Sequence, residues 1–106
     1  MVKTFQEQES LEVPLPFDKC YKLVLKTIEE NFKLISQQEK LGRIEGKGSL
    51  GWSYPPKITV QIIKINLSSS KMNVQVTASG GGLFSPNTSK QALDKFIVKF
   101  NENLSL

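Results

Sequence analysis

Histidine is absent from this 106-residue sequence, and the other residues that most often perform catalysis or bind metal are scarce. Cys20 is the only cysteine, which excludes an internal disulfide and a metal site built from several thiolates. A tetrahedral zinc site is excluded with them, because cysteine and histidine are its usual ligands. We therefore expect no metal and no other cofactor.

Arginine is also scarce, although the chain is basic. The formal net charge is +4 at pH 7, and all of the 14 basic residues except Arg43 are lysines. Nucleic-acid and phosphate sites rely on the planar guanidinium of arginine, which lysine does not replace. Nucleic acid is therefore not an expected partner, and solvated lysines that keep the protein soluble explain the charge.

Long apolar runs are missing as well. No stretch approaches the ~18 apolar residues that suggest a membrane-spanning helix, and residues 1–5 show no basic head followed by an apolar core. The sequence therefore predicts a cytoplasmic protein without a membrane span. The length favours a single domain over residues 1–106, large enough to bury a core of its own.

A continuous apolar stripe at helical spacing runs from residue 17 to residue 32, with lysines and glutamates on the other side. The stripe consists of Phe17, Cys20, Tyr21, Val24, Leu25, Ile28 and Phe32. It predicts an amphipathic helix that buries one face against a sheet. Since Cys20 belongs to this stripe, we expect a small buried hydrophobe there and not a catalytic nucleophile.

A second amphipathic helix is expected near the C-terminus, on a stripe formed by Leu93, Phe96, Ile97, Phe100 and Leu104. Residues 88–91 have the Thr-x-x-Gln form of a capping box, which predicts that this helix starts at Thr88.

Five segments alternate in the manner of strands, and they cover residues 3–13, 34–37, 43–50, 57–67 and 71–79. The first is polar enough for an edge strand and is ended by Pro14 and Pro16. Gly42 supplies the positive φ that the turn before the third strand needs. Gly46 and Gly48 lie on one face of that strand, where a helix or aromatic ring of the same protein is expected to pack closely.

The fourth strand changes its parity along its length. Ile58, Val60 and Ile62 mark one face, and the apolar positions Ile63, Ile65 and Leu67 then continue on the other. A bulge near Ile62 and Ile63 would turn all of them towards the core. Without a bulge, the strand needs cover on both faces, for instance from a second subunit.

The element order β-α-β-β-β-β-α predicts the α+β class. Short connections between strands require antiparallel neighbours, and two helices with one apolar face each require the same side of the sheet. We therefore expect a two-layer sandwich, in which an antiparallel meander of four to five strands carries both helices on one face.

Short motifs along the chain resemble those of a group of small, uncharacterised bacterial α+β domains. They lie at residues 14–17, 42–44, 49–52, 58–62 and 82–84. The arrangement is also distantly similar to a reduced helix-grip fold of the START or Bet v 1-like kind. The resemblance implies a fold and supplies no catalytic residues.

The carboxylates are not arranged for acid–base catalysis. Glu29 and Glu30 are adjacent on a helix and point in different directions, while Glu7 and Glu9 lie on a polar strand. The glycine run at residues 80–82 precedes a helix, but the lysine of a phosphate-binding loop is missing. We therefore expect no catalytic residues and no enzymatic activity.

A loop rich in glycine and proline contains Trp52 and Tyr54. Aromatic side chains in loops are frequent at binding surfaces, although a loop tryptophan also often covers the core. These residues form a candidate binding surface with Gly81 and Phe84 of a second loop, provided that the strands bring both loops to one end.

Arg43 and Lys47 extend this candidate surface, and with Lys64 they would form a modest basic strip on the solvent face of the sheet. The strip lacks the stacking aromatics of a nucleic-acid platform.

The sequence thus favours a small non-enzymatic binding or protein-interaction module. Its expected partner is an unidentified protein or a second copy of the chain, as in a homodimer. Two alternatives stay open. One is a carrier for an apolar small molecule or lipid, with a pocket between sheet and helix beside Gly46 and Gly48. The other is a homo-oligomeric structural protein.

Overall fold

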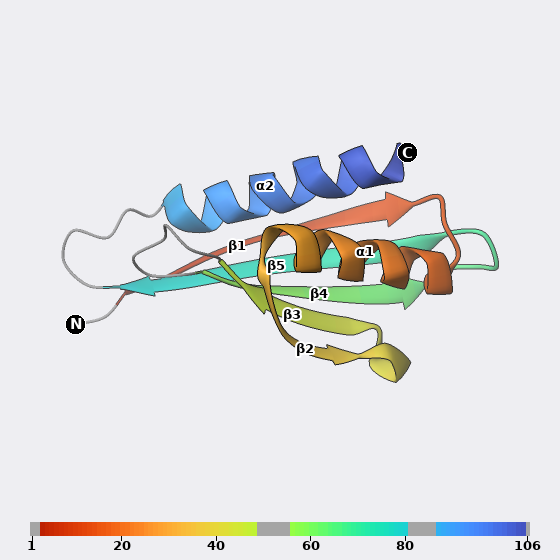
Figure 1. Ribbon diagram of the computed structural model, residues 1–106, viewed down its shortest axis with the longest axis horizontal. Coiled ribbons are helices and arrows are strands. Elements are labelled where there is room, and N and C mark those ends of the chain that lie inside the picture. Colours follow the sequence, from red (N-terminus) through yellow and green to blue (C-terminus); the bar gives the residue numbers. More distant parts are fainter. Residues whose placement is uncertain (1–2, 49–55, 81–86, 106) are drawn as a thin grey trace.

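In the computed structural model, residues 3–48, 56–80 and 87–105 are described, and they form two layers. One layer is a five-stranded antiparallel sheet, and the other consists of the helices α1 (Phe17–Asn31) and α2 (Asn87–Leu104). Both helices cover the same face of the sheet (Figure 1). The predicted α+β sandwich is therefore confirmed.

The sheet has the strand order β1-β5-β4-β3-β2. Its strands are β1 (Lys3–Val13), β2 (Lys33–Gln38), β3 (Arg43–Lys47), β4 (Lys57–Lys64) and β5 (Ser70–Gly80), and a 3-10 turn, η1 (Glu39–Leu41), joins β2 to β3. Strands β2 to β5 form the predicted meander. The polar first strand lies at one edge, as expected, and is paired along its whole length with β5.

The core fills the space between the two layers, where α1 lies over β2, β3 and β4, and α2 lies over β1 and β5. Both helices bury the stripes that the sequence predicted. The largest fully buried side chains include Phe96, Phe100, Ile28, Ile44, Ile58, Ile62 and Met72. Each such side chain contributes roughly 1.5–3 kcal/mol by leaving water, so these contacts hold the helices on the sheet.

Two glycines allow α1 and the sheet to approach closely. Gly42 adopts a positive φ of 66° in the turn before β3, as predicted, and a Cβ there would lie 2.8 Å from the ring of Phe17. A Cβ on Gly46 would lie 2.9 Å from the Cγ2 atom of Ile28. The prediction that a helix packs against this strand is therefore confirmed. The carrier alternative placed a pocket beside Gly46 and Gly48, and at Gly46 the side chain of Ile28 fills the space next to the glycine.

The predicted bulge in the fourth strand is wrong. Ile62 faces Met72 and Ile63 faces Lys71 in an unbroken register, so the alternation turns Ile63 away from the helices. The strand ends at Lys64, and Ile63, Ile65 and Leu67 are exposed. The chain leaves the sheet here because residues 65–69 form a tight turn held by hydrogen bonds of Asn66 and Ser69, which the apolar alternation did not reveal.

Several boundaries differ slightly from the prediction. β3 ends at Lys47, and residues 49–50 of the longer predicted strand lie outside the described part of the chain. Helix α2 begins at Asn87, one residue before the expected cap Thr88. β2 contains a register shift between Leu34 and Ser36, which leaves Ile35 exposed at the second edge of the sheet.

Candidate functional site

The predicted aromatic surface lies outside the described residues. Trp52, Tyr54, Gly81 and Phe84 fall in the segments 49–55 and 81–86, so this surface stays a prediction. The strands that flank these segments are described. Lys57, at the start of β4, pairs with the end of β3 and with the last part of β5. The end of β3, the start of β4 and the end of β5 therefore lie at the same end of the sheet (Figure 1).

Arg43 and Lys47 stand on the open face of the sheet, but an acidic residue separates them. Glu45 accepts a hydrogen bond from the Nε atom of Arg43 at 3.0 Å, and its carboxylate lies 3.4 Å from the Nζ atom of Lys57. Burial alone would raise the pKa of Glu45, but these two cations outweigh it and lower the pKa. The predicted strip is therefore a charge-paired cluster and not a continuous basic surface.

Lys64 does not belong to this cluster. It follows Ile62 by two residues on β4, and Ile62 is buried against the helices. Because side chains alternate along a strand, Lys64 lies on the helix side of the sheet, opposite to Arg43 and Lys47. The expectation that all three share the solvent face is wrong.

The structure gives little support to chemistry at Cys20. Its side chain is completely buried in the core, and burial raises the pKa of the thiol to about 11, so the thiolate is not populated at neutral pH.

Among the described residues, no group of three or more histidine, cysteine, aspartate or glutamate side chains is placed to hold a metal ion. Neither described helix is long and apolar enough to cross a membrane.

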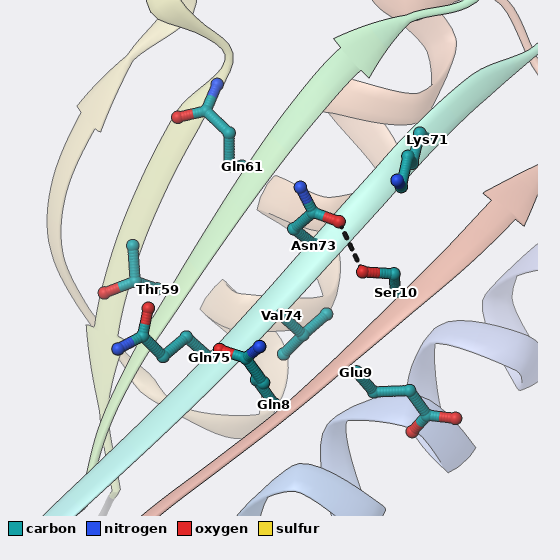
Figure 2. A pocket seen from close by; sticks show the side chains of 9 residues that line it. All are labelled: Gln8, Glu9, Ser10, Thr59, Gln61, Lys71, Asn73, Val74 and Gln75. Atoms are coloured by element: carbon teal, nitrogen blue, oxygen red, sulfur yellow. Dashed lines mark hydrogen bonds between the residues drawn. The ribbon is translucent and has the colours of Figure 1, made fainter.

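A polar hollow of about 360 Å³ occupies the open face of the sheet (Figure 2). Amides and hydroxyls from β1, β4 and β5 dominate its lining, which comprises Gln8, Glu9, Ser10, Thr59, Gln61, Lys71, Asn73, Val74 and Gln75. The hydroxyl of Ser10 donates a 2.6 Å hydrogen bond to the carboxamide of Asn73 across the β1–β5 pair. These side chains follow from the sheet register, in which Gln8 faces Gln75.

This hollow is poorly suited to tight binding. No aromatic side chain stands on the open face within the described strands, so a flat ligand would find no stacking partner. A hydrogen bond gained from an exposed amide replaces one to water and contributes only about 0.5–1.5 kcal/mol. The hollow is best explained as the solvated outer face of an antiparallel sheet.

A groove of about 350 Å³ between α1 and the end of α2 has a different character. Leu15, Leu23 and Leu104 are partly buried against the core and form an apolar floor. Lys19, Lys22 and Lys26 follow one another on successive turns of α1 and line the groove. It thus combines an apolar surface with three cationic groups.

Asn103 lines the groove and links the two helices. Its carboxamide nitrogen donates to the hydroxyl of Thr27 at 3.0 Å and to the carboxylate of Glu30 at 3.3 Å. The buried Thr27 hydroxyl in turn donates to the carbonyl of Leu23 at 2.8 Å. These bonds join the last turns of α2 to α1, so the leucine floor keeps a defined shape.

The sequence analysis did not identify this groove. The three lysines have the spacing of any solvated helix face, and Leu15 and Leu104 are 89 positions apart in the chain. The sequence feature that could have indicated the groove is the row formed by Lys19, Lys22 and Lys26 beside the apolar stripe, with no acidic residue between them. Only the packing of α2 on α1 turns this row into one side of a groove.

No family model matches the chain, and no curated protein matches its sequence. Among solved structures, Ara h 8.0201 is 17% identical with a TM-score of 0.66, and 100% of each chain is covered. A START superfamily protein from Mycobacterium smegmatis is 8% identical with a TM-score of 0.66, covering 94% of this chain and 97% of the other. A norcoclaurine synthase from Thalictrum is 10% identical with a TM-score of 0.55, covering 98% and 96%.

These similarities concern the fold, because the identities are too low to carry a function. The chain has the distant helix-grip arrangement of START and Bet v 1-like proteins, as the order of its helices and strands suggested. Since one of the similar structures is an enzyme, the fold alone does not distinguish binding from catalysis.

Proposed function

We propose that the protein is a non-enzymatic binding module for a small amphipathic anion. The ligand lies in the α1–α2 groove, with its apolar part on the leucine floor and its acid group among the lysines. The observation that carries this proposal is the combination of Leu15, Leu23 and Leu104 with three lysines in one groove. Its volume of about 350 Å³ is within the range of small-molecule sites, roughly 300–1,000 Å³.

The apolar floor supplies most of the affinity in this proposal. Apolar surface removed from water contributes about 25 cal/mol per Å², whereas an exposed ion pair contributes about 1 kcal/mol or less. The ammonium groups therefore orient the ligand and discriminate against uncharged analogues. An anion also relieves the repulsion between neighbouring lysines at helical spacing, such as Lys22 and Lys26.

The fold supports a small molecule as the ligand in preference to a protein. One of the similar structures, the norcoclaurine synthase, is in complex with a transition-state analogue, and an apolar carrier was one of the alternatives that the sequence left open. The proposed position differs from the pocket first expected beside Gly46. It lies between α1 and the end of α2, where Leu15, Leu23 and Leu104 leave accessible apolar surface.

Titration of the labelled protein with dodecanoate, followed by NMR of backbone amides, tests the proposal. We expect saturable shifts that cluster at α1 and at the end of α2. The variant Lys22→Gln, Lys26→Gln should bind about fivefold more weakly, which corresponds to about 1 kcal/mol. Lys90→Gln, an exposed lysine of α2 that does not line the groove, is the matched control and should bind normally.

Dodecanol separates the apolar from the ionic contribution, because it should bind both the wild type and the lysine variant equally. Shifts that cluster away from the groove, or dodecanoate binding that the lysine variant leaves unchanged, would contradict the proposal.

The aromatic surface predicted from the sequence gives a second comparison. A Trp52→Ala, Phe84→Ala variant should retain dodecanoate binding if the groove is the site.

A further inference from the structure

Exposed apolar side chains gather at one end of the molecule. Among the described residues, six large hydrophobic side chains are exposed, and four of them belong to this group. Leu41 is 62% exposed, Ile63 and Ile65 are each 44% exposed, and Leu67 is 85% exposed. We call these four residues the apolar tip. Leu41 ends η1, Ile63 lies near the end of β4, and Ile65 and Leu67 lie in the β4–β5 turn. These parts lie at the same end of the sheet (Figure 1).

One backbone hydrogen bond and one side-chain hydrogen bond hold the two parts of the apolar tip side by side. The amide of Ile62 donates to the carbonyl of Gly42 at 2.7 Å, and the side chain of Gln61 donates to the carbonyl of Leu41. Leu41 is therefore anchored against β4 immediately before Ile63.

The turn that presents Leu67 is also fixed. Its backbone closes through the amide of Asn66, which donates to the carbonyl of Ser69 at 3.2 Å. The Asn66 carboxamide oxygen accepts bonds from the Ser68 amide at 2.8 Å and from the Ser69 hydroxyl at 3.0 Å. Leu67 sits at the apex of this turn, so its exposure follows from defined turn geometry.

Three lysines lie at the same end as the apolar tip. Lys40 precedes Leu41 and Lys71 faces Ile63 across the β4–β5 pair, while Lys64 lies between Ile63 and Ile65 in the chain and is on the helix side of the sheet. All three side chains are exposed. Carboxylates at this end include Glu39 in η1, Glu12, which faces Lys71 from β1, and Asp18 in the first turn of α1, whose neighbour Phe17 packs on Gly42. With Lys19, which follows Asp18, the four lysines outnumber these three acids, so this end is weakly basic.

We propose that the apolar tip inserts into the surface of an anionic lipid bilayer. Leucine and isoleucine side chains enter the boundary between headgroups and acyl chains, while the lysines at this end bind acidic headgroups. A second copy of the chain fits this end less well, because a two-fold contact would place lysines against lysines. The inference does not depend on the proposed ligand groove, and the two are tested separately.

Sedimentation with lipid vesicles tests this inference with the intact chain. The vesicles contain phosphatidylcholine alone or with about one third phosphatidylglycerol, whose negative surface attracts basic segments. The wild type should bind the anionic vesicles, and less strongly as salt increases. Leu67→Ser and Leu41→Ser should each reduce binding about five- to tenfold, because each removes one inserted side chain.

Val98→Ser is the matched control, since Val98 is exposed on α2 and lies outside the tip. It should bind like the wild type. Three results would overturn the inference: no binding of the wild type to anionic vesicles, binding that Leu67→Ser leaves unchanged, or a dimer in light scattering that Leu67→Ser dissociates. The last would show that a second copy covers the tip. Dodecanoate binding by Leu67→Ser should remain normal.

Discussion

The hydroxyl of Tyr21 is an unusual group in this core. Its ring is buried on α1 and stacks on Phe17 with a centroid distance of 6.3 Å, yet the oxygen has no hydrogen-bond partner among the described residues. Burying an unpaired hydroxyl costs about 1–3 kcal/mol. Burial also raises the pKa of Tyr21, with a smaller contribution from the charge of Glu39.

We therefore expect Tyr21→Phe to increase the free energy of unfolding by about 1 kcal/mol in urea titrations, because it removes the unpaired oxygen and keeps the ring. Tyr21→Ala serves as the comparison and should lower stability by several kcal/mol through loss of the ring. A destabilised Tyr21→Phe variant would mean that the hydroxyl has a partner after all.

Cys20 offers a probe of how the folded protein opens. Because the thiol is buried and its pKa is raised to about 11, we expect very slow reaction with an aromatic disulfide reagent at neutral pH. The reaction rate should rise with urea in parallel with unfolding measured by circular dichroism. Rapid labelling without urea would show that α1 separates from the sheet under native conditions.

Glu45 gives the fold a defined pH dependence. Its pKa is lowered in the folded protein, so its ion pairs stabilise the fold above the ordinary glutamate pKa, and this contribution is lost as the pH falls through the lowered value. Glu45→Gln should reduce stability at neutral pH by about 0.5–1 kcal/mol. At about pH 3 the two proteins should differ less. A difference that stays constant with pH would exclude an ionic origin.

The contact between α1 and β3 depends on a missing side chain. A Cβ on Gly46 would lie 2.9 Å from the Cγ2 atom of Ile28 and 3.1 Å from the carbonyl oxygen of Lys33. Gly46→Ala should therefore cost about 1–3 kcal/mol, because the helix must move away from the strand. Urea titrations of both single variants and of Gly46→Ala, Ile28→Ala test this. The double variant should lose less free energy of unfolding than the sum of the losses of the two single variants, because Ile28→Ala makes room for the new methyl group.

Most helices and strands could be predicted from the sequence, because the residues that they bury recur at helical or strand spacing. The stripe of α1 predicted which side of the helix faces the core, and the alternation in residues 71–79 predicted β5, where Met72, Val74 and Val76 are buried. The end of β4 was not readable in this way. Ile63, Ile65 and Leu67 continue the apolar alternation, and the turn that interrupts it depends on hydrogen bonds of Asn66 that no hydrophobic pattern contains.

The candidate site was harder to predict than the fold, because it arises between elements. Leu23 and Leu104 come together only when the end of α2 packs on α1, and the bond from Asn103 to Thr27 that fixes them has no periodic signal. The aromatic surface around Trp52 was predicted from composition alone and remains to be tested. Tertiary packing therefore decides which lysines and leucines form a site.

At the scale of the whole molecule, β1 completes the fold from one edge. It pairs with β5 in an unbroken register from Lys3 to Val13 and contributes the buried side chain of Val13 to the core. A chain without residues 1–13 would expose the edge of β5 and part of the surface under α2. We expect this truncated chain to lose cooperative thermal unfolding and to associate in light scattering. A monomeric, cooperatively unfolding product would contradict the expectation.

The pairing of the first strand with the fifth also sets an order of events during protein synthesis. Lys3 faces Gly80, so β1, which is synthesised before β5, has no partner until β5 has been made. The β2–β5 meander has local connections and can form earlier, whereas joining β1 requires closure of a long loop. The many polar side chains of β1 then have a second consequence, since they keep the waiting segment soluble while the ribosome completes its partner.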